Sequence, residues 1–173
     1  MVDKDFDDVL IKDLLTYEQP TRYLVTDTDY SNDKNLTPVL TANKSFILGY
    51  TYEEQGIYQK GECIIFDDFT MELKYVEFPF KVKSSAIKIL TQKPGVNLKF
   101  VFEFLSFLNL STTEHKRHYI SEIELISLTV PTIKVQRDIA EVLSKIDKKI
   151  DIELKLRQLL LKQKKSLLSN VFI

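Results

Sequence analysis

The sequence predicts an α+β protein in which an irregular, β-rich domain over residues 1–130 is followed by one long helix within residues 131–173. Three observations predict this arrangement. Short apolar or alternating runs separated by turn residues fill the first segment, which holds all four glycines. The second segment has no glycine, and its only proline is its first residue. The formal charge also changes, from -6 over residues 1–130 to +5 over residues 131–173.

Five strands are predicted in the first segment, because five runs are apolar or alternating and are bounded by turn-forming residues. They cover residues 37–40, 45–50, 62–66, 72–78 and 85–90. A helix is predicted over residues 98–109, because Asn97 offers a side-chain cap before a mostly apolar run. Since the residues of that helix are apolar on nearly every side, we expect it to be heavily buried. Val130 should be extended, because Pro131 follows it.

The C-terminal segment is predicted to be helical from about residue 134 to about residue 170. Apolar residues recur there at spacings of three, four or seven, which places them on one face. They are Ile139, Leu143, Ile146, Ile150, Leu154, Leu161 and Leu168. Such a helix is ~55 Å long, whereas a small domain is only ~30 Å across, so the helix must project. We therefore expect this stripe to pack in a coiled coil against a partner helix, from another copy or another protein. The alternative is a core helix packed on its own domain.

Composition excludes several classes of protein. The chain has 173 residues, of which 44% are hydrophobic and 28% charged, which is typical of a globular protein and not of a disordered one. A single cysteine, Cys63, excludes an intramolecular disulfide framework. The acidic start does not have the basic flank of a signal peptide, and no apolar run reaches the ~20 residues that span a bilayer. We therefore expect a cytoplasmic protein without a membrane partner.

The sharpest enzymatic candidate is a metal-dependent nuclease built from Asp68, Glu72 and Lys74. An acid on one strand and Glu-x-Lys on the next can hold Mg²⁺ and activate water. The spacing, however, places both acids in one tight hairpin. The alternative is a turn in which Asp67 and Asp68 accept backbone N–H bonds, while Glu72 and Lys74 form a solvated strand face.

Two further kinds of catalytic site find little support. The histidines, His115 and His118, have no third ligand near them in sequence, and the alternative is a solvated turn. The four glycines are scattered and do not form a nucleotide-binding loop. The sequence therefore favours a binding surface over a catalytic centre.

Two polar segments suit a nucleic-acid interface. Residues 41–45 place four polar side chains in a turn, and Lys81 and Lys83 fall on one face of a strand before two serines. Lysines and hydroxyl groups are common contacts to DNA phosphates, and lysine and asparagine also contact base edges. The net acidity of residues 1–130 counts against DNA binding, although a local patch can dominate.

Several blocks, read together and in order, resemble one known family. Residues 17–23, 37–50, 64–70 and 80–86 are similar to a target recognition domain of the specificity (S) subunits of type I restriction-modification systems. Residues 130–143 and 146–150 are similar to the start of the spacer helix of that family. The usual Thr-Ala-Gly-Lys turn of the family has Asn43 in place of glycine, and asparagine tolerates the left-handed conformation.

The resemblance implies a function without catalysis. An S subunit reads a two-part DNA sequence and docks methyltransferase (modification) and restriction subunits. This chain resembles half of one, so it implies a homodimer, or pairing with another half-S chain, that reads a palindromic double-stranded site. The resemblance further implies that the helices of the two halves form an antiparallel coiled coil. The chain itself would need no cofactor, since S-adenosylmethionine, ATP and Mg²⁺ belong to the partner subunits. A coiled-coil adaptor that binds no DNA is the other alternative.

The resemblance and the polar segments together give the expected DNA-contacting residues. The first choices lie in the 41–44 turn, the next in the 81–85 segment, and three further residues complete the set. They are Thr41, Asn43 and Lys44, then Lys81, Lys83, Ser84 and Ser85, and then Thr70, Arg22 and Tyr50.

Overall fold

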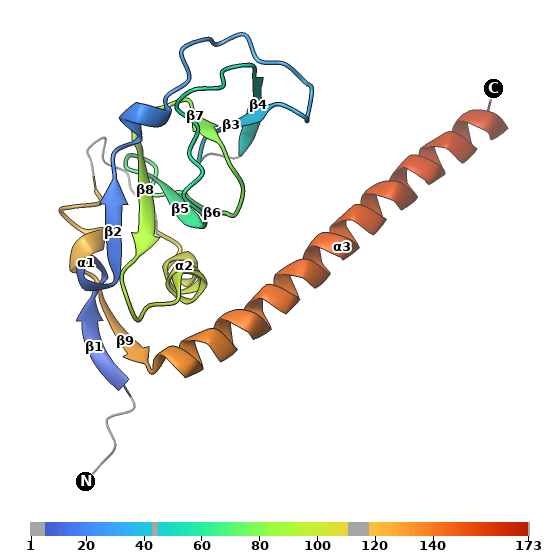
Figure 1. The fold of residues 1–173 in the computed structure, drawn as a ribbon. Coiled ribbons are helices and arrows are strands. Elements are labelled where there is room, and N and C mark those ends of the chain that lie inside the picture. The colour runs from blue at the N-terminus through green and yellow to red at the C-terminus, as the bar shows by residue number, and fades with distance from the viewer. Residues whose placement is uncertain (1–5, 43–44, 111–117, 173) are drawn as a thin grey trace.

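A β-rich globule and one long helix that leaves it make up the fold in the computed structural model, which describes residues 6–42, 45–110 and 118–172 (Figure 1). This confirms the predicted α+β class. The strands are β1 (Phe6–Leu10), β2 (Leu15–Glu18), β3 (Thr37–Leu40), β4 (Ile47–Thr51), β5 (Cys63–Asp67), β6 (Leu73–Val76), β7 (Lys81–Val82), β8 (Ile87–Gln92) and β9 (Ser127–Pro131). The helices are α1 (Ile11–Leu14), α2 (Leu98–Phe107) and α3 (Ile133–Val171), with short 3₁₀ turns η1 (Pro20–Tyr23) and η2 (Ile123–Leu125).

The strands form three small sheets over the described parts of the chain. The largest is antiparallel with the order β2-β8-β5-β6, and a second has the order β4-β3-β7, with β3 and β7 parallel. The third pairs β1 with β9 in antiparallel register. Since β9 ends just before α3 begins, the β1–β9 ribbon lies at the base of the long helix (Figure 1).

Two apolar cores lie on opposite faces of the largest sheet. Along β5, Ile64 and Phe66 belong to one core, while Cys63 and Ile65 belong to the other. The first core also includes residues of α1 and α2, and the second includes residues of β3, β7 and η1. Successive residues of a strand point to opposite faces, so a strand covered on both faces is apolar throughout.

Helix α2 begins where its cap residue predicts. The Asn97 side chain accepts a hydrogen bond from the backbone N–H of Phe100 at 2.9 Å, which satisfies one of the orphan donors of the first turn. The expected heavy burial holds for most of the helix but not for its last turn, where Phe107 is 84% exposed. The cores cover one side of the helix only, and its buried residues are Leu98, Val101 and Leu105.

Helix α3 confirms the predicted long helix to within one residue at each end. Its 39 residues correspond to about 58 Å, and the helix runs away from the globule beyond its first turns (Figure 1). Only Gln136 and Ala140 are buried, and every residue from 145 to 172 is exposed. The alternative of a core helix is therefore wrong. Within the described residues, no helix is both long enough and apolar enough to cross a membrane.

A partly exposed carboxylate, Glu53, joins its own loop to the 24–36 loop and to strand β7. One of its oxygens accepts hydrogen bonds from the Thr26 N–H at 2.8 Å, the Thr26 hydroxyl at 2.9 Å and the Asp27 N–H at 2.9 Å. The other oxygen lies 2.6 Å from the ammonium of Lys81. Burial alone would raise the pKa of Glu53, but the hydrogen bonds and the ammonium outweigh it and lower the pKa from 4.5 to about 2.

We expect Glu53→Gln to lower the free energy of unfolding near pH 7 by about 1–3 kcal/mol, because Lys81 loses its counter-charge. A lowered carboxyl pKa stabilises the fold above the unfolded value, and that stability is lost as pH falls through the folded value. The difference from wild type should therefore shrink between pH 4.5 and about 2. Urea denaturation across this range measures it, with the exposed neighbour changed in Glu54→Gln as a control. A difference that stays constant down to pH 2 would contradict this account.

Candidate nucleic-acid interface

Three turns meet at one end of the largest sheet and surround a depression of about 910 Å³. The β3–β4 connection supplies two hydroxyl residues, the β5–β6 turn supplies a third, and the β7–β8 connection supplies a lysine and two serines. We call this depression the turn hollow. It is lined by Thr41, Ser45, Leu48, Asp67, Thr70, Glu72, Lys83, Ser84 and Ser85.

Strand register explains why these turns come together. Strands β3 and β7 are parallel with Leu40 opposite Val82, so the residues that follow them leave the sheet side by side. The Lys83 N–H donates to the Leu40 carbonyl at 3.1 Å. The Thr41 N–H donates to the Phe46 carbonyl at 3.0 Å, which closes the β3–β4 connection. The partner of Asp67 in β8 is Ile87, so the β5–β6 turn lies beside the start of β8.

The β5–β6 turn is held by its own side chains. One Asp67 oxygen accepts hydrogen bonds from the N–H groups of Phe69 at 2.9 Å and Thr70 at 3.0 Å. Met71 has a φ of 59°, in the left-handed region that closes the turn. The expected turn chemistry of Asp67 is confirmed, and it presents the exposed Thr70 at the rim of the turn hollow.

The turn hollow carries both signs of charge. Lys83 is exposed, and none of the contacts between described residues gives its ammonium a hydrogen bond or an ion pair. The Glu72 carboxylate, half-exposed on the same lining, has no such partner within the described ranges either. The same lining holds the hydroxyl residues Thr41, Ser45, Thr70, Ser84 and Ser85. This lining can donate to phosphate oxygens through Lys83 and accept from base amino groups through Glu72.

Lys81 does not belong to this surface, so the expectation that it shares an exposed face with Lys83 is wrong. Its side chain is 4% exposed, and its ammonium donates to the Gln55 carbonyl at 2.7 Å and pairs with Glu53. Strand β7 is only two residues long, so regular alternation does not continue to Lys83. Sequence spacing could not find this distant partner. The predicted contacts Asn43 and Lys44 lie outside the described residues.

Two other predicted contacts lie away from the turn hollow. Tyr50 lines a separate shallow depression together with Pro38 and Phe78. Arg22 is exposed on η1. Gly56, from the loop that follows β4, packs against the Arg22 backbone with a φ of +64°. A Cβ at that glycine would lie 2.5 Å from the Arg22 carbonyl oxygen, so the close approach requires glycine.

The residues of the nuclease alternative are not assembled into a metal site. The Asp68 carboxylate is buried 3.2 Å from the Lys88 ammonium and accepts the Tyr119 N–H at 2.8 Å. Glu72 and Lys74 line depressions at the surface instead. No group of three histidine, cysteine or acidic residues in the described part of the chain is placed to hold a metal ion.

The expected solvated turn around the histidines is also wrong for His118, which is 1% exposed. Its Nδ1 atom lies 3.0 Å from an oxygen of Glu122, four residues later in the chain. His115 lies outside the described residues. Nothing in the sequence pattern signals this burial, which depends on contacts with the β5–β6 turn fifty residues earlier.

A family model provides the decisive comparison. The model described as type I restriction modification DNA specificity domain matches residues 3–162. The chain belongs to this family. The specificity subunit of the Escherichia coli type I restriction enzyme EcoR124I/EcoR124II is 42% identical over 146 residues. The match covers 77% of the specificity-domain chain but only 36% of that subunit, so the chain spans about a third of the relative.

Solved structures agree with the fold of this specificity-domain chain. The S subunit of a type I system from M. genitalium has a TM-score of 0.65 at 11% identity, covering 85% of this chain and 40% of that protein. The HsdS subunit from Thermoanaerobacter tengcongensis has a TM-score of 0.55 at 12% identity, covering 87% and 39% respectively. At these identities the likeness shows a shared fold alone.

The two lysines of the β7 segment should respond differently to removal of their charge. Lys81→Met removes a buried ammonium and leaves the partly exposed Glu53 without its ion pair, and we expect it to lower the free energy of unfolding by about 1–3 kcal/mol. Lys83→Met alters an exposed side chain and should change it by less than about 0.5 kcal/mol. Chemical denaturation of both variants measures the contrast. Equal losses would show that the Lys81 pair adds nothing.

Proposed function

We propose that the chain is a sequence-specific DNA-recognition subunit of a type I restriction-modification system and that it performs no catalysis itself. The observation that carries this proposal is the turn hollow, where three turns gather Thr41, Thr70, Lys83, Ser84 and Ser85. Membership of the specificity-domain family supports it, as does the name of the E. coli relative.

The chemistry of the turn hollow fits the reading of a groove. Lys83 can neutralise a phosphate and set the register of the domain on the duplex. The hydroxyl groups can each donate or accept, so they suit base edges as well as phosphates. Glu72 would be repelled by phosphates, but a carboxylate can accept from the amino group of cytosine in the major groove.

We further propose that α3 pairs with the same helix of a second copy in an antiparallel coiled coil. The seven predicted positions, from Ile139 to Leu168, share one face, and all but the half-buried Leu143 are exposed. Two recognition domains held in this way would read a palindromic bipartite site with a fixed gap. Half-sites of two-fold dimers lie ~34–36 Å apart, which a helix of about 58 Å can span.

The assembly would dock methyltransferase and restriction subunits, and S-adenosylmethionine, ATP and Mg²⁺ would act on those partners. The coiled-coil adaptor remains the competing function, since it needs the helix but not the turn hollow. Methylome sequencing of cells that express the chain with a compatible methyltransferase subunit decides between them. A new methylated bipartite motif supports recognition, and an unchanged methylome together with a pure dimer supports the adaptor.

Lys83→Ala should weaken binding to a mixed-sequence duplex about tenfold and lower the slope of log affinity against log salt by about 0.9, the value for one lost phosphate contact. Fluorescence anisotropy at several salt concentrations measures both quantities. Lys12→Ala is the matched control, because Lys12 is also exposed but lies on α1, away from the turn hollow. If the two variants behave alike, the binding surface lies elsewhere.

Replacement of two stripe residues, Ile150→Asp and Leu154→Asp, should convert the dimer to a monomer, because the seam would bury unpaired charges. Sedimentation velocity over a wide concentration range measures the change. Ile152→Asp is the control, because Ile152 is 63% exposed on the opposite side of the same helix. A wild-type chain that stays monomeric at every concentration rules out the pairing.

A further inference from the structure

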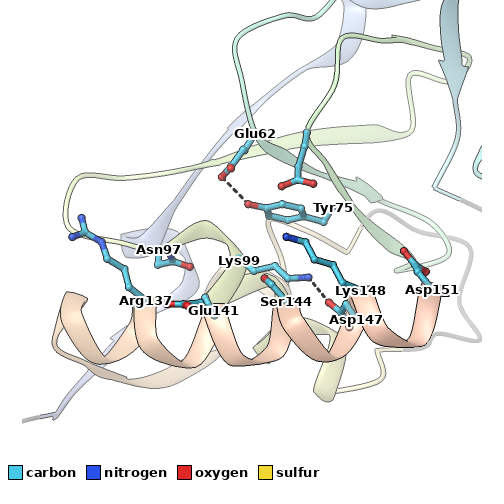
Figure 2. Close-up of a pocket in the computed structure, with 12 residues that line it drawn as sticks. Glu62, Tyr75, Asn97, Lys99, Arg137, Glu141, Ser144, Asp147, Lys148 and Asp151 are labelled. Carbon is cyan, nitrogen blue, oxygen red and sulfur yellow. Dashed lines mark hydrogen bonds and ion pairs between the residues drawn. The ribbon is translucent and has the colours of Figure 1, made fainter. Parts of the chain in front are cut away.

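Helix α3 leaves the globule along a cleft of about 490 Å³, shown in Figure 2. Tyr75 of β6 and Lys99 of α2 line it from the globule, while Glu141, Asp147 and Lys148 line it from α3 (Figure 2). The domain and the helix face each other here along the stretch of α3 from Arg137 to Asp151. The contacts in this cleft therefore decide the direction in which α3 projects.

Lys99 makes the central contact across this cleft. Its ammonium lies 2.7 Å from a Glu103 oxygen on its own helix and 2.8 Å from an Asp147 oxygen on α3. The same ammonium lies 5.2 Å from the ring centroid of Tyr75 and 4.8 Å from that of Phe102. The Lys99 side chain is only 16% exposed, so these interactions are partly shielded from water.

A second contact fixes α3 nearer its start. Gln136 is 2% exposed, and its amide oxygen accepts the Asn97 N–H at 2.9 Å. Its amide nitrogen donates to the Pro131 carbonyl at 2.8 Å. Gln136 and Asp147 are eleven residues apart, or ~16 Å along the helix. One contact would act only as a pivot, whereas two contacts this far apart define a direction.

We propose that Lys99 is a positioning residue that, together with Gln136, fixes the angle between the recognition domain and α3 and so sets the gap between the two DNA half-sites. The inference about the gap rests on the proposed function, whereas the inference about the angle does not. Removing the Lys99 charge should leave the Gln136 contact as a pivot.

The pKa of Lys99 agrees with this geometry. Burial alone would lower it, but the hydrogen bonds to Asp147 and Glu103 outweigh burial and raise the pKa above its ordinary value of 10.5. The Lys99 ammonium is therefore charged throughout the neutral range.

A small change of angle is enough to alter the gap. The turn hollow lies beside the Ile87 end of β8, whereas the chain enters α2 just after the Gln92 end. The five residue steps from Gln92 to Ile87 span ~17 Å, so a rotation of the domain by about 10° about the α2 end would move the turn hollow by about 3 Å. One base pair rises ~3.4 Å, so such a rotation in each copy is comparable to a change of one to two base pairs.

Selection from a duplex library with variable gaps tests the functional part. We expect Lys99→Met to keep the same half-site bases while accepting gaps that vary by one to two base pairs, and Lys99→Arg to restore a single gap. Lys145→Met is the matched control, because it breaks the exposed pair of Lys145 with Glu141 on the same helix. A single gap for a folded, dimeric Lys99→Met overturns the assignment of the gap to Lys99.

Electron-spin distance measurements test the angle without DNA. Labels at Gln59→Cys and Lys155→Cys, in a Cys63→Ala background and diluted with unlabelled chain, report the distance between globule and helix. Lys99→Met should broaden the distance distribution by about 3 Å, the displacement that a rotation of about 10° produces over the length of a strand. Asp147→Asn should do the same from the helix side, should Lys99→Met not fold. Unchanged distributions overturn the proposal, whereas broadening without any selected bipartite site would contradict the proposed function alone.

Discussion

The constraint on which the structure depends is that α3 is longer than the domain that carries it. Only Gln136 and Ala140 are buried among its 39 residues, and beyond Asp147 the helix has no globule to pack against. An isolated helix gains little stability in water from propensity alone, and this is the reason for proposing that a second helix covers the exposed apolar stripe. In the proposed assembly, the recognition domain is placed on DNA through the base of α3. The short segment from Pro131 to Asp147 thus links the packing of the globule to the geometry of the complex.

The turn hollow depends on two ion pairs that hold the segments next to it. Glu53 ties the 24–36 loop to Lys81 at the start of β7, and the buried pair of Asp68 with Lys88 lies next to the turn that carries Thr70. The side chains of Lys81, Lys88 and Asp68 are buried, and Glu53 is partly exposed. A buried ion must keep its partner to be tolerated. The two ion pairs use lysines that are therefore not available to DNA. In the proposed function, the exposed Lys83 carries more of the electrostatic attraction than the count of lysines suggests.

Local patterns predicted those parts of the fold whose causes are local. Asn97 caps α2, and the repeating apolar spacing gives both ends of α3, because a cap and a helical face are each set within a few residues. Of the interface, Thr41, Thr70, Lys83 and the two following serines were predicted and are brought together. The burial of Lys81 and His118 and the β1–β9 pairing could not be predicted, since their partners lie far away in sequence. The sequence predicted Glu72 to be either a metal ligand or part of a solvated strand face, although its place near the end of a β-turn could have suggested the interface.

The charge of the turn hollow links the two proposals, DNA recognition and pairing of α3. Residues 1–130 carry a net charge of -6, and the hollow combines Lys83 with two carboxylates, Asp67 and Glu72. Few phosphate contacts mean a small gain from counterion release, so a single domain binds DNA weakly. Joining two domains makes the second contact intramolecular and can raise the overall affinity by ~10²–10⁴ without any new contact, provided that the geometry allows both to bind at once. We therefore infer that a weak reading surface would depend on a rigid connection, and in this proposal the angle at Lys99 decides which pairs of half-sites can gain from it.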